Sequence, residues 1–271
     1  MRPEIIAEIG WNHMGDMNLA SKMIKAAKNS GADIAKFQTW KVSRLKDGEW
    51  DNDGRRSIYE NAELSKEQHL FLIEVCRKEN IEFMSSAFSV EDAKLLSNLN
   101  CKKIKIPSFE VNNFELLDFC KKHFSIIYVS TGTANKDEIL KLSNFFRSWD
   151  GKLIVMHCVS AYPCNSEKIN LPRINHLREF FKNVGFSDHT QGTLSTISSI
   201  FLNPLAIEKH FTIDHNLPGR DNKFAILPSE LKELTEFIHI REQCNKDHGM
   251  NYQKIEEDSR KFYRGRFAAS K

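Results

Sequence analysis

Short apolar runs alternate with amphipathic segments along almost the whole chain, and this alternation occurs eight times. The apolar runs have the Ile, Val and Phe content typical of strands, and they cover residues 4–10, 33–39, 81–87, 101–107, 125–131, 152–158, 183–189 and 204–210. A helical pattern follows each run, at residues 18–30, 65–79, 90–99, 114–122, 136–147, 172–181, 193–202 and 229–243. Strands alternating with helices at this spacing favour parallel βαβ units. Eight units without a break in composition predict a single-domain α/β fold, a closed (β/α)8 TIM barrel, over an open doubly wound sheet.

Local signals place helix starts and loops within this pattern. Asn18 is expected to cap the first helix, and Ser65 with Gln68 forms a capping-box sequence at the start of the second. Long loops at residues 40–64 and 212–228 follow the second and eighth strands, so both should lie at the C-terminal mouth of the barrel, where active sites occur. We expect a catalytic barrel domain over residues 1–250 and a charged tail over residues 251–271.

The two faces of each predicted strand differ in polarity. One face is apolar throughout, as at Ala35 and Phe37, and should pack under the outer helices. The other face becomes polar at the C-terminal end of every strand. In chain order its polar positions are Glu8, Lys36, Gln38, Ser86, Lys105, Ser130, Cys158, Ser160, Ser187, His189, Glu208 and His210. Burying an unpaired charge is costly, so these groups should face one another or a ligand. A purely structural layer of ion pairs is the alternative, and Lys103 has no evident partner.

Composition and charge exclude several classes of protein. A net charge of +3, from 39 basic and 36 acidic residues without a basic stripe, does not indicate a nucleic-acid or anionic membrane partner. The apolar runs are all shorter than a membrane span, and the N-terminus does not resemble a signal peptide. The six cysteines form no CxxC pair, so we expect reduced thiols in a cytoplasmic protein.

The polar positions suggest a site for a small, highly charged anion. Lys36 and Lys105 come from alternate strands, which contribute to one layer of a barrel, so their ammonium groups can converge. With Ser86, Ser108 and Ser130 they would bind a molecule that carries phosphate and carboxylate groups.

A metal site is the second expectation. His189 and His210 end neighbouring strands and would hold a divalent metal, with Glu8 or Asp221 as nearby oxygen donors. Mixed nitrogen and oxygen donors suit Mn²⁺, Co²⁺, Mg²⁺ or Zn²⁺ without choosing among them. Two structural histidines are the alternative. An anion cradle beside a metal that polarises a carbonyl suggests the joining of a phosphorylated three-carbon unit to an aldehyde.

Two other functions compete with this one. A Schiff-base aldolase would use Lys36 or Lys105, but the sixth strand carries no lysine after Lys152. A barrel that binds a ligand or partner without turnover would have no reason to keep a ring of buried polar groups.

Seven motifs give the chain a family resemblance. In order they are AEIGWNHMGD, GADIAKFQTW, KIPSFEVNN, STGTAN, HCVSAYPC, GFSDHT and IEKHFTIDHNLPGRD. Over residues 4 to about 243 the chain resembles the N-acetylneuraminate (sialic acid) synthase family, which includes the pseudaminate and legionaminate synthases. The resemblance implies a TIM barrel that condenses phosphoenolpyruvate with an open-chain N-acyl-hexosamine or related aldose. The implied products are a sialic-type (nonulosonic) acid and phosphate.

The resemblance also implies residue roles. Metal ligands would be His189 and His210, with Mn²⁺ the expected metal. Phosphoenolpyruvate would be bound by Lys36, Ser86, Lys105, Ser108, Ser130 and Ser187. Gln38, Tyr162 and Asp221 would bind the sugar, and the catalytic carboxylates would be Glu8, Glu110 and Glu208. General acid–base help would come from Glu110 or Glu208, which the sequence does not rank. The resemblance further suggests a homodimer.

The chain departs from the family in three places. Family members usually continue into a small antifreeze-like domain, which we do not expect in residues 251–271. Ser160 stands where the sialate branch often has Asn, and Phe109 resembles the pseudaminate branch. The acceptor sugar is therefore open.

Overall fold

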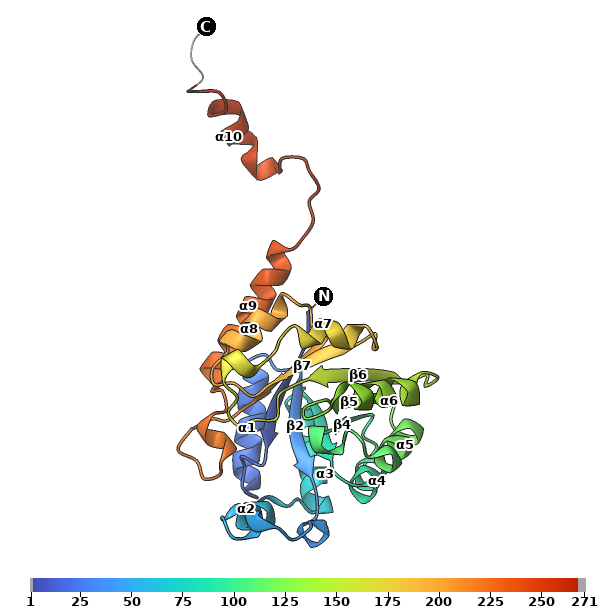
Figure 1. The fold of residues 1–271 in the computed structure, drawn as a ribbon. Helices are drawn as coiled ribbons and strands as arrows, with labels where there is room; N and C mark the ends of the chain where they lie inside the picture. Colours follow the sequence, from blue (N-terminus) through green and yellow to red (C-terminus); the bar gives the residue numbers. More distant parts are fainter. Residues whose placement is uncertain (1, 268–271) are drawn as a thin grey trace.

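A computed structural model describes residues 2–267 of the chain and contains a closed barrel of parallel strands (Figure 1). The strands are β1 (Glu4–Gly10), β2 (Ile34–Thr39), β3 (Glu82–Ala87), β4 (Lys103–Ile106), β5 (Ile126–Ser130), β6 (Lys152–His157), β7 (Val184–Asp188) and β8 (Ala206–His210). Each pairs with the next in parallel, and β8 closes the ring on β1. The predicted (β/α)8 barrel is confirmed.

Helices follow the strands and surround the barrel. They are α1 (Met17–Asn29), α3 (Lys66–Lys78), α4 (Val90–Asn98), α5 (Phe114–His123), α6 (Lys136–Phe146), α7 (Arg173–Arg178), α8 (Leu194–Ile200) and α9 (Pro228–Cys244). The capping box of Ser65 and Gln68 is confirmed, since each side chain bonds the backbone N–H of the other. The prediction that Asn18 caps the first helix is wrong. The Asp16 carboxylate caps α1 by accepting from the N–H groups of Asn18 and Leu19, which a negative charge at a helix N-terminus does better than an amide.

Apolar side chains fill two separate spaces. The outward strand faces, with residues such as Phe37 and Ile104, pack under the helices as predicted. Inside the barrel a smaller apolar cluster of Ile6, Ile34, Met84, Tyr128, Ile154, Met156 and Ala206 fills the lower and middle levels. This apolar cluster separates the inward polar positions at the C-terminal end of the barrel from those at its N-terminal end.

Lys103 has partners that the sequence did not reveal. Its ammonium lies 2.7 Å from both Glu4 Oε1 and Glu82 Oε2 at the N-terminal end of the barrel, and Tyr128 donates to Glu4. The charge for which the sequence showed no partner is therefore paired at the N-terminal end of the barrel.

The two long loops are partly ordered into short helices. Residues 40–64 contain η1 (Val42–Arg44), η2 (Glu49–Asp51) and α2 (Arg55–Ala62), and the loop after β8 contains η5 (Asp221–Lys223). The centroid of the Tyr59 ring lies 4.9 Å from the centroid of the Trp11 ring and 5.3 Å from that of the Trp40 ring. These edge-to-face contacts hold α2 beside the mouth of the barrel.

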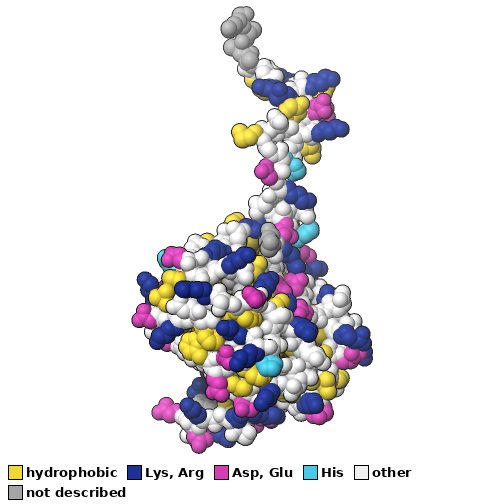
Figure 2. Space-filling model, turned by 90° about the vertical axis from the view of Figure 1, so that its right-hand side faces the viewer, with side chains coloured by type: hydrophobic (Ala, Val, Ile, Leu, Met, Phe, Trp, Pro, Cys, Tyr) yellow, Lys and Arg dark blue, Asp and Glu magenta, His cyan; other side chains and the backbone are white. Residues whose placement is uncertain are grey.

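The C-terminal segment lies outside the barrel. After α9 the chain is exposed through residue 267 and forms η6 (Lys254–Glu256) and α10 (Glu257–Phe262), which project away from the barrel in Figure 1. The predicted charged tail of residues 251–271 thus contains a short helix, and its last four residues lie outside those described. Figure 2 shows acidic and basic side chains interspersed over the face drawn there. Within residues 2–267 every helix is too short or too polar to cross a membrane.

Candidate active site

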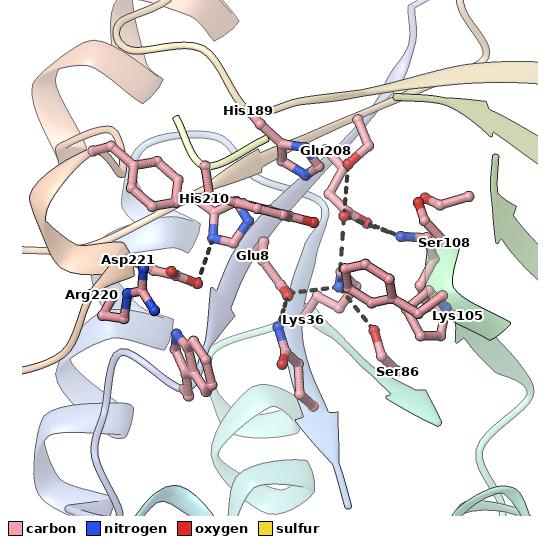
Figure 3. A pocket seen from close by; sticks show the side chains of 18 of the residues that line it. Glu8, Lys36, Ser86, Lys105, Ser108, His189, Glu208, His210, Arg220 and Asp221 are labelled. Carbon is pink, nitrogen blue, oxygen red and sulfur yellow. Dashed lines mark hydrogen bonds and ion pairs between the residues drawn. The ribbon is translucent and has the colours of Figure 1, made fainter. Parts of the chain in front are cut away.

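The C-terminal ends of the strands surround a pocket of about 520 Å³ (Figure 3). Most of the predicted site residues line it, namely Glu8, Lys36, Gln38, Ser86, Lys105, Ser108, Ser130, Tyr162, Ser187, His189, Glu208, His210 and Asp221. The inward polar positions of separate strands therefore converge on one cavity.

Strand register explains this convergence. Glu8 on β1 stands opposite Lys36 on β2 and also opposite His210 on β8. Ser86 on β3 pairs in the same way with Lys105 on β4. Since side chains alternate along a strand, partners at one level of neighbouring parallel strands point to the same side of the sheet.

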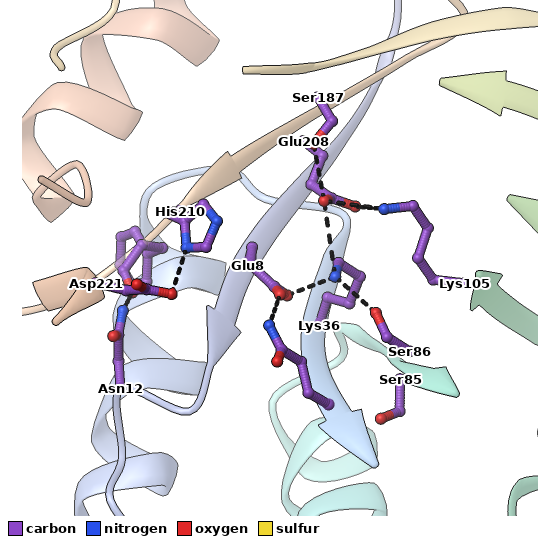
Figure 4. A network of polar contacts seen from close by, with 12 residues as sticks. Glu8, Asn12, Lys36, Ser85, Ser86, Lys105, Ser187, Glu208, His210 and Asp221 are labelled. Carbon is purple, nitrogen blue, oxygen red and sulfur yellow. Dashed lines mark hydrogen bonds and ion pairs between the residues drawn. The ribbon is translucent and has the colours of Figure 1, made fainter. Parts of the chain in front are cut away.

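The closed end of the pocket holds two lysines and two carboxylates in one network (Figure 4). Lys36 Nζ lies 2.8 Å from Glu8 Oε2 and 3.7 Å from Glu208 Oε1. Lys105 Nζ donates to both Glu208 oxygens at 3.2 Å, and Gln38 Nε2 donates to Glu8 Oε1 at 2.6 Å. All four charged groups are buried, so their attractions are much less screened than in water.

The two carboxylates of this network differ in proton affinity. Burial raises the pKa of Glu8, and the charge of Glu208 adds to this against the opposing effect of Lys36. Burial also acts on Glu208, but the ammonium groups of Lys105 and Lys36 outweigh it and hold the pKa of Glu208 at about 2. Burial lowers the pKa of Lys105, whereas for Lys36 the two carboxylates outweigh burial and raise the pKa. Glu208 is therefore firmly ionised, and Glu8 takes up a proton more readily.

Serine hydroxyls complete the network at its edges. Lys36 Nζ donates to Ser86 Oγ at 3.1 Å, and Ser187 Oγ donates to Glu208 Oε1 at 3.0 Å. Both serines are thus within reach of any anion that approaches the two lysines.

The β5 end forms a tight backbone loop beside the network. The Gly132 N–H donates to Ser108 Oγ at 3.1 Å, and the same hydroxyl lies 3.0 Å from Cys158 Sγ. A Cβ at Gly132 would come within 2.2 Å of Ser160 Oγ, so only glycine fits there. Ser130 Oγ and Ser160 Oγ are buried without a hydrogen-bond partner in the described chain, so both hydroxyls are available to a polar ligand.

The two predicted metal-binding histidines lie together on the other side of the pocket. Their ring centroids are 5.5 Å apart, and the Tyr162 ring is 4.4 Å from that of His189. His189 Nδ1 donates to Val159 O at 2.7 Å, which leaves Nε2 as the ring acceptor. His210 Nδ1 lies 3.4 Å from Asp221 Oδ2.

This donor set fits a metal with several open positions. Metal-binding histidines usually donate from their second nitrogen to a carbonyl or carboxylate, as His189 does here, whereas His210 Nδ1 lies near Asp221 without a hydrogen bond. Burial lowers the pKa of both imidazoles, which favours the neutral, ligand form. Within residues 2–267 no three histidine, cysteine or carboxylate side chains form a ready-made metal site, so water or substrate would supply the remaining ligands.

Two other acidic residues have different positions. Burial and the charge of Glu8 raise the pKa of Asp221 to about 7 at the pocket wall. Glu110 was predicted as a catalytic residue, but it does not line the pocket. It follows β4 on the 3-10 turn η3 (Ser108–Glu110), where strand alternation no longer applies, and its Oε2 accepts from Asn113 Nδ2 at 2.7 Å.

The sequence did not predict several other residues that line the pocket. They are Trp11, Arg55, Tyr59, Phe88, Pro107, Pro163, Gln191, Arg220, Lys223 and Phe224, together with Phe109, which had been noted only for its branch resemblance. They lie after strand ends or in long loops, where no sequence periodicity indicates the direction in which a side chain points. For Arg220 and Lys223 a signal was present, since they flank Asp221 in sequence.

A closed parallel barrel with a charged pocket at the C-terminal strand ends defines a TIM-barrel enzyme. The model of the NeuB family matches residues 23–249, and the chain belongs to this family. The sequence-based resemblance is confirmed.

Named relatives agree with this assignment. The chain is 35% identical over 255 residues to the N,N'-diacetyllegionaminic acid synthase of Legionella pneumophila, covering 88% of this chain and 72% of that protein. It is 34% identical over 278 residues to a pseudaminic acid synthase of Campylobacter jejuni, covering 98% and 81%. A crystal structure of N-acetylneuraminic acid synthetase from Leptospira borgpetersenii, in complex with citrate, superposes with a TM-score of 0.85 at 30% identity, covering 100% of this chain and 94% of that one.

Proposed function

We propose that this chain condenses phosphoenolpyruvate with an open-chain N-acyl-hexosamine or related aldose, giving a nonulosonic acid and phosphate with the help of a divalent metal. The chain is a sugar-acid synthase by family, since its relatives carry the names of such synthases. One observation carries the proposal for this particular pocket. A buried pair of lysines and a pair of histidines line the same cavity, at different sides of it.

The lysines and serines form the phosphoenolpyruvate site in this proposal. Lys36 and Lys105 each have a carboxylate partner that an incoming phosphate or carboxylate could replace or share. The unpaired hydroxyls of Ser130 and Ser160 add donors without charge. Binding there would direct C3 of phosphoenolpyruvate toward the histidine side.

The reaction forms a C–C bond and a bond from C2 to a water oxygen, and it breaks the bond from C2 to the phosphate oxygen. C3 of phosphoenolpyruvate attacks the aldehyde carbon, whose oxygen takes a proton and becomes a hydroxyl. Water adds at C2 and gives up one proton, which replaces the proton taken by the aldehyde oxygen. As the bond between C2 and the phosphate oxygen breaks, the new C2 hydroxyl gives its proton to the departing phosphate, which leaves the 2-keto acid. We assign the proton donor for the aldehyde oxygen to Glu8, because its pKa is raised while that of Glu208 is held low.

Glu208 has a different role in this scheme. It stays ionised and fixes the two ammonium groups, as its contacts with Lys105 and Lys36 indicate. The metal would be held by His189 and His210, and bound there it would polarise the aldehyde carbonyl. Mn²⁺ is the metal we expect.

Phosphate release tests this function. Purified protein is incubated with phosphoenolpyruvate and a panel of N-acyl-hexosamines and aldoses, with and without chelator. We expect release that depends on both an acceptor and a divalent metal, and a loss of at least about 100-fold in His189→Ala and His210→Ala with an unchanged circular-dichroism spectrum. Full activity in either variant would exclude the metal assignment. No release with any acceptor would overturn the proposed reaction.

A Schiff-base aldolase remains the competing reaction. It would need a neutral lysine, and burial does lower the pKa of Lys105. Borohydride in the presence of pyruvate would then trap a covalent adduct, which we do not expect because Lys105 donates to both oxygens of Glu208. The cytoplasmic location and the homodimer stay predictions from the sequence.

A further inference from the structure

A buried cysteine stands behind the proposed anion site, and the reaction described above assigns it no role. Cys158 follows β6, is 1% exposed, and its Sγ lies 3.0 Å from Ser108 Oγ. Ser108 lines the pocket (Figure 3), whereas Cys158 does not. Within residues 2–267 this serine is the only hydrogen-bond partner of the thiol. The thiol can therefore act on a ligand in the pocket through Ser108.

The contact between the two side chains crosses the end of β5. Ser108 follows β4 and Cys158 follows β6, and β5 lies between these two strands in the closed barrel. Gly132, just past β5, leaves the space for this contact. A Cβ there would come within 2.7 Å of Ser108 Oγ and 2.9 Å of Cys158 Sγ. The segments after β4, β5 and β6 thus meet at one point behind the wall of the pocket.

The Ser108 hydroxyl can form a limited set of hydrogen bonds. Its oxygen can accept two, and its single proton can be donated once. The Gly132 N–H, which can only donate, takes one acceptor position at 3.1 Å. The contact with Cys158 then has two possible directions. Either the thiol donates to the oxygen and fills the second acceptor position, or the hydroxyl donates its proton to the sulfur.

The first direction leaves both groups satisfied. A thiol that donates to Ser108 uses its one proton, whereas in the second direction that proton has no acceptor within residues 2–267. Buried polar groups are rarely left without a partner. Sulfur is also a weak acceptor, so the hydroxyl gains little by turning away from an anion toward it. With both acceptor positions filled, the proton of Ser108 remains for a ligand in the pocket.

A second hydroxyl shows independently that this wall faces a ligand. Ser130, the last residue of β5, is 3% exposed and lines the pocket. Its Oγ has no hydrogen-bond partner in the part of the chain that the structure describes. An anion at this wall would therefore receive one proton from Ser130 and one from Ser108.

We propose that Cys158 is a positioning residue for phosphoenolpyruvate, because its thiol and the Gly132 N–H together turn the proton of Ser108 toward the bound anion. The proposal rests on the proposed function, which places phosphoenolpyruvate in this pocket. A donor that is already oriented need not be ordered on binding, so the thiol should act on the affinity for this substrate. The chemical step should change little, since Cys158 does not line the pocket.

Binding of phosphoenolpyruvate in the absence of an acceptor tests the proposal without turnover. Calorimetry compares the wild type with three variants. We expect Cys158→Ala to raise Kd by about three- to tenfold, since the Ser108 hydroxyl is then free to turn away. Cys158→Ser keeps a donor and should stay within about twofold of the wild type. Ser108→Ala removes the bond to the anion and should raise Kd by about tenfold or more.

A double variant separates positioning from packing. In Ser108→Ala/Cys158→Ala there is no hydroxyl to orient, so loss of the thiol should add less than about twofold to the Kd of Ser108→Ala. Cys120→Ala is the matched control, because it removes a buried thiol of α5 from the core outside the barrel, and it should keep wild-type affinity. Circular dichroism and melting temperatures check that each variant is folded.

Several results would overturn the proposal. An unchanged or lower Kd in Cys158→Ala would show that Ser108 donates to the sulfur. Equal weakening by Cys158→Ala and Cys158→Ser, or an undiminished effect of Cys158→Ala in the Ser108→Ala background, would show that the thiol acts by packing alone.

Steady-state assays of phosphate release keep this proposal and the proposed function distinguishable. Cys158→Ala should raise KM for phosphoenolpyruvate and keep kcat within about twofold of the wild type. The expected order of Kd values without phosphate release from any acceptor would overturn the proposed function alone. Release with wild-type KM in Cys158→Ala would overturn only the role of the thiol.

Discussion

Single residues in this pocket owe their chemistry to their immediate neighbours. Glu8 and Glu208 are both buried carboxylates on adjacent strands, yet the first has a raised pKa and the second a lowered one. The difference arises because Glu208 contacts two ammonium groups, and Glu8 shares one of these while it also faces the negative charge of Glu208. The residue type alone does not show which carboxylate can donate a proton and which stays ionised, because the neighbouring charges decide this.

Replacing Glu8 tests the assigned proton donor. Glu8→Gln keeps the size of the side chain and removes the transferable proton, so kcat should fall by about 100-fold to 10,000-fold. KM for phosphoenolpyruvate should change far less, because the lysines remain. Stopped assays for phosphate measure both values, and Glu91→Gln on the exposed face of α4 is the control. A kcat within threefold of wild type would exclude the role.

Buried histidines make the fold sensitive to acid. Burial and the charge of Arg173 lower the pKa of His157 to about 4, against a small opposing effect of Asp188, while its Nε2 lies 2.8 Å from Ile169 O. The unfolded chain therefore binds a proton from about pH 6.5 downward that the folded chain resists until about pH 4. The free energy of unfolding should fall as pH drops through this window, by at most about 3 kcal/mol for this residue.

Denaturant titrations at pH 7, 5.5 and 4.5 measure that slope. His157→Gln should be less stable at pH 7 and lose less stability on acidification. His176→Gln alters an exposed histidine on α7 and should retain the wild-type slope. Identical slopes in all three proteins would show that His157 titrates normally.

At the scale of elements, the ends of β7 and β8 are joined behind the site. Lys209 Nζ lies 2.9 Å from Asp188 Oδ2, and Thr196 Oγ1 of α8 donates to the same oxygen at 2.5 Å. Asp188 and Lys209 each precede a predicted metal-binding histidine and face the opposite side of the strand. This buried pair fixes the two strand ends from which His189 and His210 enter the pocket.

Breaking the pair should be costly. Lys209→Met leaves the buried Asp188 charge unpaired and should lower the free energy of unfolding by about 3–5 kcal/mol. Asp188→Asn/Lys209→Met removes both charges and should recover a large part of that loss. Urea titration measures each value, with Lys232→Met of an exposed pair on α9 as control. A single variant within 1 kcal/mol of wild type, on the scale of an exposed pair, would contradict this account.

At the scale of the whole molecule, the barrel and the C-terminal segment differ in what they bury. Helix α9 buries Leu231, Leu234 and Ile238 against the barrel core. Residues 245–267 are exposed, and apolar side chains such as Ile255 on η6 and Phe262 on α10 contact solvent. Figure 2 shows some of these apolar side chains on the projecting segment. Stability should therefore reside in residues 2–244.

Deletion of residues 250–271 tests that division. The melting temperature should change by less than about 2 °C, because no part of the core is lost. Deletion from residue 228 onward removes the α9 contacts and should abolish cooperative unfolding. Calorimetry of both proteins measures the effect, and a fall of more than about 5 °C in the shorter deletion would show that the segment supports the barrel.

The sequence by itself determined the barrel and most of its pocket. Strand alternation has a period of two, so the polar face of each strand is readable, and closure of parallel strands brings those faces to one end. This is why Lys36, Lys105, His189 and His210 were predicted together. The same alternation along the strands also identified the apolar faces that pack under the helices.

Only the tertiary structure decided the rest. The direction of Glu110, the partners of Lys103 and the positions of Arg55 and Arg220 depend on contacts between residues far apart in the chain. Past the end of a strand no repeat fixes where a side chain points. Loop conformation then depends on distant packing, such as Tyr59 against Trp11, and proton affinity depends on which charges that packing brings near.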